Sequence, residues 1–172
     1  MLKIISIAAL ALTLSSCASV ENILNSSNNS AAIKDMTTSV DGKKGLVTLQ
    51  SSHSVKDTAD KLVSIIESKG MEVFARVDHQ KNAQGVDLTL RPTQVIMFGN
   101  PTAGTPLMNC EQSVAIDLPQ KILISEDTDK KVWLSYNHPE YLKTRHNIKG
   151  CDTEIANIAK ALNSVSKAAV AK

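Results

Sequence analysis

The pair Asp78-His79 has the residue types of an acid–base or metal site. A carboxylate beside an imidazole can orient the ring as a general base or tune it as a metal ligand. The pair ends an expected strand, where side chains point into the cleft formed by the next loop. Adjacent residues on an extended strand face opposite ways, however, so direct contact between the two is not expected. We therefore favour a structural role, in which Asp78 caps the following segment and His79 packs or bonds to backbone.

His146 is the second candidate, because it precedes a loop and would join His79 in one pocket if their elements meet. No short spacing such as His-x-x-x-His links the two histidines, and the sequence suggests no third ligand. The sequence therefore predicts no metal site and no cofactor. Asp78, His79 and His146 in one cleft remain the basis of an alternative hypothesis: an enzyme, or a metal- or cofactor-dependent redox protein.

Asn100 is the third candidate, within Phe98-Gly99-Asn100-Pro101. Glycine permits close backbone approach, and a residue before proline favours an extended or turn conformation. A structural corner explains all four residues, and the alternative is that Asn100 faces a ligand. The chain has no glycine-rich phosphate motif and no Gly-x-Ser-x-Gly elbow, so neither nucleotide binding nor serine hydrolysis is expected.

The N terminus predicts a different kind of chemistry. Leu14-Ser15-Ser16-Cys17 closes an apolar run that follows Lys3. This order is typical of a lipoprotein signal peptide cut before Cys17, which would then carry lipid; an ordinary secretory signal is the alternative. We expect a signal peptide over 1–16, a lipidated cysteine with a flexible tether over 17–44, and one domain over 45–172. Ala18 is not the aspartate associated with inner-membrane retention, so we expect an outer-membrane anchor facing the periplasm.

Charge and cysteine content narrow the class further. Nineteen Lys and Arg against seventeen Asp and Glu give a net charge of +2, and aromatic residues are scarce. Neither a strong positive field nor stacking platforms are present, so nucleic-acid binding is not expected. In an oxidising compartment, Cys110 and Cys151 are expected to form a disulfide, with two buried free thiols as the alternative.

Hydrophobic periodicity predicts an α+β domain with a mainly antiparallel sheet and helices packed on one face. Expected helices are one capped by Ser54 and ended by Gly70, shorter ones at 105–112 and 139–145, and a long terminal one capped by Asp152 or Thr153. The expected strands lie at 45–52, 71–77, 94–98, 121–125 and 131–136, with an irregular one near 86–90. Val73, Ala75 and Val77 are expected to share one face of their strand.

Several short runs carry a family resemblance: Val77-Asp78-His79, Phe98-Gly99-Asn100-Pro101, Gly104-Thr105-Pro106-Leu107-Met108, Ile116-Asp117-Leu118-Pro119 and Val132-Trp133-Leu134-Ser135-Tyr136-Asn137. In this order, over about Gly45 to Val165, the chain resembles the family called domain of unknown function 302. The resemblance implies a curved antiparallel sheet similar to the TATA-binding-protein fold and a tendency to homodimerise, and it implies no reaction. His138 departs from the family pattern, in which an aspartate is expected before Pro139.

These observations predict an envelope lipoprotein with a non-enzymatic, dimeric domain that binds a small ligand or partner in the periplasm. Its expected partners are the membrane, through the lipid anchor, a second copy and a small molecule. The candidate ligand-binding residues are Asp78, His79, Asn100 and His146. A structural or interaction lipoprotein without a ligand remains a further alternative.

Overall fold

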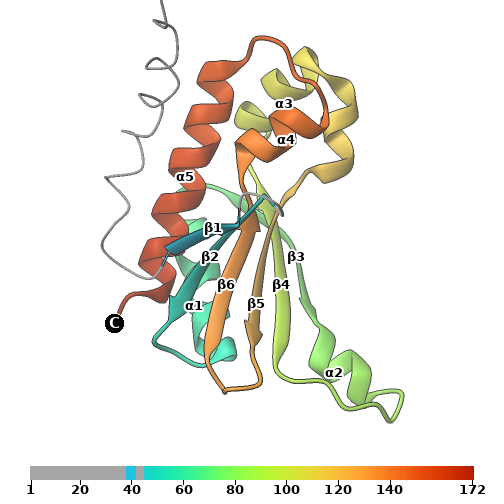
Figure 1. Ribbon diagram of the computed structural model, residues 1–172, viewed down its shortest axis with the longest axis vertical. Helices are drawn as coiled ribbons and strands as arrows, with labels where there is room; N and C mark the ends of the chain where they lie inside the picture. The colour runs from blue at the N-terminus through green and yellow to red at the C-terminus, as the bar shows by residue number, and fades with distance from the viewer. Residues whose placement is uncertain (1–37, 42–44) are drawn as a thin grey trace, which may run out of the picture. The chain divides into compact units, whose positions relative to one another are not determined.

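The computed structural model describes residues 38–41 and 45–172. In this part of the chain, six antiparallel strands form one sheet (Figure 1). The order across the sheet is β1-β2-β6-β5-β4-β3. The bounds are β1 Thr38–Asp41, β2 Leu46–Ser51, β3 Glu72–Asp78, β4 Thr93–Gly99, β5 Gln120–Glu126 and β6 Val132–Asn137. The predicted α+β class with an antiparallel sheet is confirmed, as is the β5–β6 hairpin.

The sheet begins earlier in the chain than predicted. β1 pairs with β2 from Thr38 opposite Leu49 to Asp41 opposite Leu46, so residues 38–41 belong to the domain rather than to the tether. A four-residue strand with one large apolar side chain is too short to show an alternating pattern. The expected signal peptide, Cys17 and the rest of the tether lie outside the described residues.

Two helices, α1 (Val55–Ser68) and α5 (Asp152–Val170), pack on one face of the sheet (Figure 1). As predicted, Ser54 caps α1, and its side chain accepts a hydrogen bond from the Asp57 amide. The core between the helices and the sheet is aliphatic. Its fully buried members include Leu49, Leu62, Ile66, Ile96, Ile122, Ile124, Leu134, Ile155 and Leu162.

The start of α5 differs from the prediction. Cys151 precedes the helix in a left-handed conformation (φ 56°) and makes no side-chain capping hydrogen bond to the described residues. Asp152, a predicted cap, is instead the first helical residue, and its carboxylate pairs with Lys143 on the preceding helix, α4 (Pro139–Arg145). An acidic side chain in the first turn still favours the helix dipole.

Four short helical segments lie between the longer elements: α2 (His79–Gln84), α3 (Pro101–Cys110), the 3-10 helix η3 (Gln112–Asp117) and α4 (Pro139–Arg145). The expected start of α3 near Thr105 is wrong. Asn100 accepts a hydrogen bond from the Thr102 amide at 2.9 Å, and Pro101 occupies the first helical position. Asparagine followed by proline is a favourable helix start, which places Pro106 inside the helix.

His138 takes the capping position where the family resemblance suggested an aspartate. Its ring Nδ1 accepts a hydrogen bond from the Glu140 amide at 3.2 Å, and Pro139 follows as the first residue of α4. The imidazole thus performs the hydrogen-bonding role of a carboxylate cap without its fixed negative charge.

Strand β3 contains an irregularity that corrects a further prediction. Val73 lies opposite Phe98, but Ala75 lies opposite Met97, so Phe74 is an extra residue in the strand. Cross-strand partners share a face, and a bulge therefore moves the following side chains to the other face. Val73 faces the helices with Phe98, whereas Ala75 and Val77 face the opposite side.

The segment after α2 is not the irregular strand that its alternating pattern suggested. Val86 and Leu88 are 65% and 64% exposed, and the Leu88 amide donates to Ala83 O at 2.9 Å. These contacts fold the segment back on α2, so the alternating side chains have no sheet to cover.

The second face of the sheet carries no helix among the described residues (Figure 1). Its apolar side chains are half-buried. They are Ala75, Val77, Val95, Met97, Leu123 and Trp133, which we call the open face.

Candidate functional site

Asp78 and His79 lie at the opposite end of the sheet from Asn100. Antiparallel pairing sets Asp78 opposite Gln94, whereas Glu72 lies opposite Gly99, the residue before Asn100. Six steps along a strand at about 3.3 Å each separate the two ends by about 20 Å. These residues therefore do not form one site.

Asp78 has the structural role that we favoured. Its Oδ1 accepts a hydrogen bond from the Lys81 amide at 2.9 Å and caps α2, while its Oδ2 accepts from Gln94 Nε2 at 3.3 Å. His79 is the first residue of α2 and is exposed.

His146 lies near the end of the sheet that carries Asn100. Its Nε2 is 2.6 Å from Asp117 Oδ2, and Asp117 lies three residues before Gln120, which pairs with Phe98. The hypothesis of one cleft shared by Asp78, His79 and His146 is therefore wrong, because the first two lie beyond the other end of β3.

The surroundings of His146 contain an arrangement that the sequence did not predict. The side chains of His146 and Asp117 are only 7% and 13% exposed, and Ser113 Oγ lies 3.0 Å from His146 Nδ1. Arg145 adds a longer contact to Asp117 at 3.4 Å. Serine, imidazole and carboxylate thus form one hydrogen-bonded series between η3 and the end of α4.

Glu111 makes this series unsuitable for nucleophilic catalysis. Its carboxylate accepts from the Ser113 amide at 3.0 Å, and hydrogen bonds from that amide and the Ser113 hydroxyl lower the pKa of Glu111. In acyl transfer at Ser113, an oxyanion would form beside this negative charge. Such an oxyanion needs preorganised hydrogen-bond donors around it instead. The series therefore serves to join η3 to α4.

A disulfide reinforces this connection. Cys110, at the end of α3, is bonded to Cys151, immediately before α5, with 6.5 Å between their Cα atoms. The segment formed by α3 and η3 is thus held to the C-terminal helices covalently at one point and by His146 at another.

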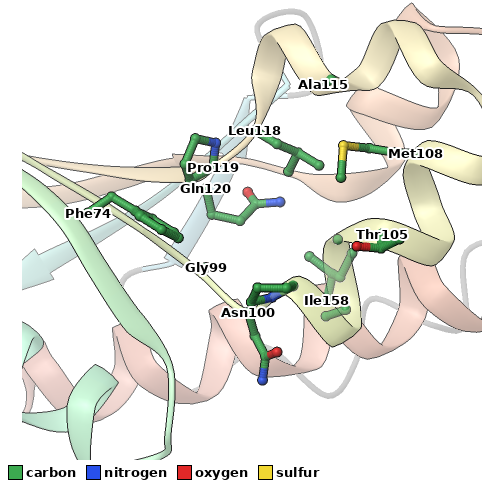
Figure 2. A pocket seen from close by; sticks show the side chains of 13 residues that line it. Phe74, Gly99, Asn100, Thr105, Met108, Ala115, Leu118, Pro119, Gln120 and Ile158 are labelled. Carbon is green, nitrogen blue, oxygen red and sulfur yellow. The ribbon is translucent and has the colours of Figure 1, made fainter.

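These constraints help to position a cavity of about 320 Å³ at the end of the sheet (Figure 2). Segments from β3, α3, η3, the start of β5 and α5 contribute to its walls. The lining residues are Phe74, Gly99, Asn100, Pro101, Ala103, Gly104, Thr105, Met108, Ala115, Leu118, Pro119, Gln120 and Ile158. None of these thirteen side chains is ionisable, and most are apolar.

A second cavity of about 320 Å³ adjoins the first. Both are lined by Gly99, Asn100, Ala103, Gln120 and Ile158, so the first turn of α3 passes between them. The second cavity extends along α5 past Glu154 to Leu162. Volumes of this size are at the lower end of those typical of small-molecule sites.

The side-chain amide of Gln120 is a polar group that both cavities share. Its Nε2 is buried and has no hydrogen-bond partner among the described residues. Figure 2 shows this amide extending from the start of β5 into the cavity, toward Met108 and Thr105. A buried donor without an acceptor destabilises a protein by about 1–3 kcal/mol, so this group is available to a ligand.

Asn100 lines the cavities, but its amide is otherwise engaged. Its Oδ1 accepts from the Thr102 amide and hydroxyl, and Figure 2 shows the amide turned away from Gln120. Sequence reasoning missed Gln120 and Phe74, which contribute to the site. Gly99 was the one sequence feature that could have indicated close packing here, because an added Cβ at this position would lie 3.4 Å from the Phe74 ring.

Two further properties bear on function. Within the described ranges, no group of three or more His, Cys, Asp or Glu side chains could hold a metal ion. Among the helices of the same ranges, none combines the length and apolar character needed to cross a bilayer.

The domain is similar to a solved structure, the crystal structure of an uncharacterized conserved DUF302 protein from Bacillus stearothermophilus. The two superpose with a TM-score of 0.66 at 18% sequence identity, over 73% of this chain and 98% of the other. At this identity, the likeness shows the fold alone.

Curated relatives from Brucella match part of the chain. Proteins named fluoride-specific ion channel FluC 1, from Brucella suis and Brucella abortus, are 44% identical over 112 residues. The match covers 65% of this chain but only 44% and 41% of those proteins, so the chain spans less than half their length. The family model described as "Domain of unknown function DUF302" matches residues 47–165. The chain therefore belongs to the DUF302 family.

Proposed function

We propose that this chain is a non-enzymatic envelope lipoprotein whose domain binds a small apolar ligand beneath the first turn of α3. The observation that carries the proposal is an apolar cavity in which Gln120 Nε2 is buried and has no hydrogen-bond partner among the described residues. Small-molecule sites characteristically combine apolar walls with a few polar groups that orient the ligand.

Binding is a better match to the cavity than catalysis. General acid–base chemistry needs a titratable side chain within hydrogen-bond reach of the reacting group. The lining of the first cavity has none, and the Ser113 hydroxyl of the Ser113–His146–Asp117 series lies beside the Glu111 carboxylate.

Occlusion of the cavity tests this proposal. Ala103 lines both cavities, so Ala103→Phe should abolish binding of a neutral fluorescent probe such as N-phenyl-1-naphthylamine. Ala156→Phe places the same ring on an exposed position of α5 and should leave binding unchanged. Equal probe affinity in both variants, with unfolding temperatures near that of wild type, would contradict the proposal.

The lipid anchor is a separate part of the proposal, supported by the Leu14-Ser15-Ser16-Cys17 motif. Radiolabelled palmitate should be incorporated by the wild-type chain and not by Cys17→Ser. Equal labelling of the two would remove the anchor and the outer-membrane location that depends on it.

We also propose that a second copy covers the open face. Its half-buried apolar side chains, Leu123 and Trp133 among them, are suited to a partner surface. Sedimentation should show a dimer that Leu123→Arg dissociates, whereas Gln112→Arg, on exposed η3, should leave it intact. A wild-type monomer at high micromolar concentration would refute this assembly.

A second candidate function is an accessory role in fluoride transport, favoured by the names of the Brucella relatives. In this case the domain would act beside a membrane channel rather than conduct ions itself. Deletion of the gene should then lower the fluoride concentration that arrests growth, and unchanged tolerance would remove this candidate.

A further inference from the structure

We infer that the cavity beneath α3 is selective for an uncharged, elongated ligand with one hydrogen-bond acceptor, such as an aliphatic ester or amide. The inference rests on the proposed ligand-binding function and specifies the chemical class of the ligand. It depends on the Gln120 donor, the charges around the two cavities and the way the cavities adjoin.

The Gln120 amide sets the requirement for an acceptor. Its buried Nε2 donates to no described residue, although it lines both cavities. A ligand carbonyl oxygen would satisfy this donor, whereas a pure hydrocarbon would leave it unpaired. An ammonium group would likewise leave Nε2 without an acceptor, because it has only donors to offer.

The surrounding charges select against an anionic head group. Glu154 is the one charged side chain among the described residues that line the two cavities, and it is negative. Lys121 follows Gln120 in the chain, but its Nζ donates to the carbonyl oxygens of Asp117 and Pro119 at 3.1 and 3.0 Å. A carboxylate beside Gln120 would therefore be buried without a partner cation, which is strongly unfavourable.

The arrangement of the cavities favours an elongated ligand body. They adjoin at Gln120 and Ile158 and extend in two directions, toward Phe74 in one and toward Leu162 in the other. An aliphatic chain with its carbonyl near the shared Gln120 would place apolar groups against both sets of walls. Burial of those methylene groups supplies the main driving force for binding.

A matched pair of ligands tests the inference. Methyl octanoate and octanoate share one chain and differ in charge at pH 7.5, and each is titrated against the bound N-phenyl-1-naphthylamine probe. We expect the ester to displace the probe at a concentration at least about tenfold lower than the carboxylate. Displacement by octanoate at an equal or lower concentration would overturn the inference while leaving the proposed binding function in place.

Variants of Gln120 test the role of its donor. Gln120→Leu should weaken displacement by the ester about five- to tenfold, the effect of one hydrogen bond, with little change in probe affinity. Gln120→Met has a similar length, loses the donor and should weaken the ester as well. Gln112→Leu, the same exchange at an exposed position of η3, should have no effect.

The outcomes separate the two proposals. Unchanged ester affinity in both Gln120 variants would overturn the inference, even with normal probe binding. Absence of probe binding by folded wild-type protein would instead remove the proposed ligand-binding function, and the inference would fall with it.

Discussion

Removal of the Cys110–Cys151 disulfide should destabilise the domain by an amount that its sequence separation determines. The bond joins residues 41 apart, and the chain-entropy model assigns a closed loop of that length about 4 kcal/mol at 25 °C. The double variant Cys110→Ala/Cys151→Ala should lose most of this free energy of unfolding. The hydrogen bonds of His146 to Asp117 and Ser113 remain, so the folded structure should persist.

Urea unfolding followed by Trp133 fluorescence measures the effect. For a domain of this size the slope of free energy against urea is about 2 kcal/mol/M, so the midpoint should fall by about 2 M. The slope should also rise, because an unfolded chain without the cross-link exposes more surface. Reductant should lower the wild-type midpoint to that of the variant and should not affect the variant itself.

A loss below about 1 kcal/mol with an unchanged slope would refute this reasoning. It would mean either that the bond is not formed in the protein or that the reduced, unfolded chain remains constrained around the same loop.

Three further predictions concern individual residues: Tyr136, Gly45 and Asp127. Burial raises the pKa of Tyr136 to about 12 from 10, so the unfolded chain loses this proton at a lower pH than the folded chain does. The free energy of unfolding should therefore fall between pH 10 and 12, by at most about 2–3 kcal/mol. Tyr136→Phe should flatten that decline. Gly45→Ala should destabilise by more than about 2 kcal/mol because its Cβ would overlap the Tyr141 ring, whereas Gly70→Ala, also at positive φ but in open space, should lose only about 1 kcal/mol by thermal unfolding. Hydrogen bonds from an indole and two backbone amides lower the pKa of Asp127, and NMR titration should show this carboxyl ionising below its usual range; a normal value would contradict those bonds.

The parts of the fold set by local chemistry were predictable from the sequence. Ser54 marked the start of α1, and the 3.6-residue spacing of Ile155, Ile158 and Leu162 identified the buried side of α5. The hairpin of β5 and β6 followed from two apolar runs with a polar connection. In each case neighbouring residues carry the information.

Features that depend on distant parts of the chain were not predictable in the same way. The reversal of Ala75 and Val77 arises from the register with β4, which a two-residue alternation cannot show. The sequence does not show that His79 and His146 lie at opposite ends of the sheet, because their positions depend on the order and direction of the strands. In the sequence Gln120 is an ordinary polar residue after Pro119. Only the folded structure shows that its Nε2 is buried and unpaired within the part of the chain that the structure describes.

One wall of the cavity exists because strand β3 contains one extra residue, Phe74. Because it is the extra residue of β3, deleting one codon there would restore an uninterrupted pairing with β4. The same event would remove an aromatic wall of the cavity and leave Val73 opposite Phe98, on the helix side of the sheet. Homologues with and without this insertion would thus share a fold and differ in the shape of this cavity.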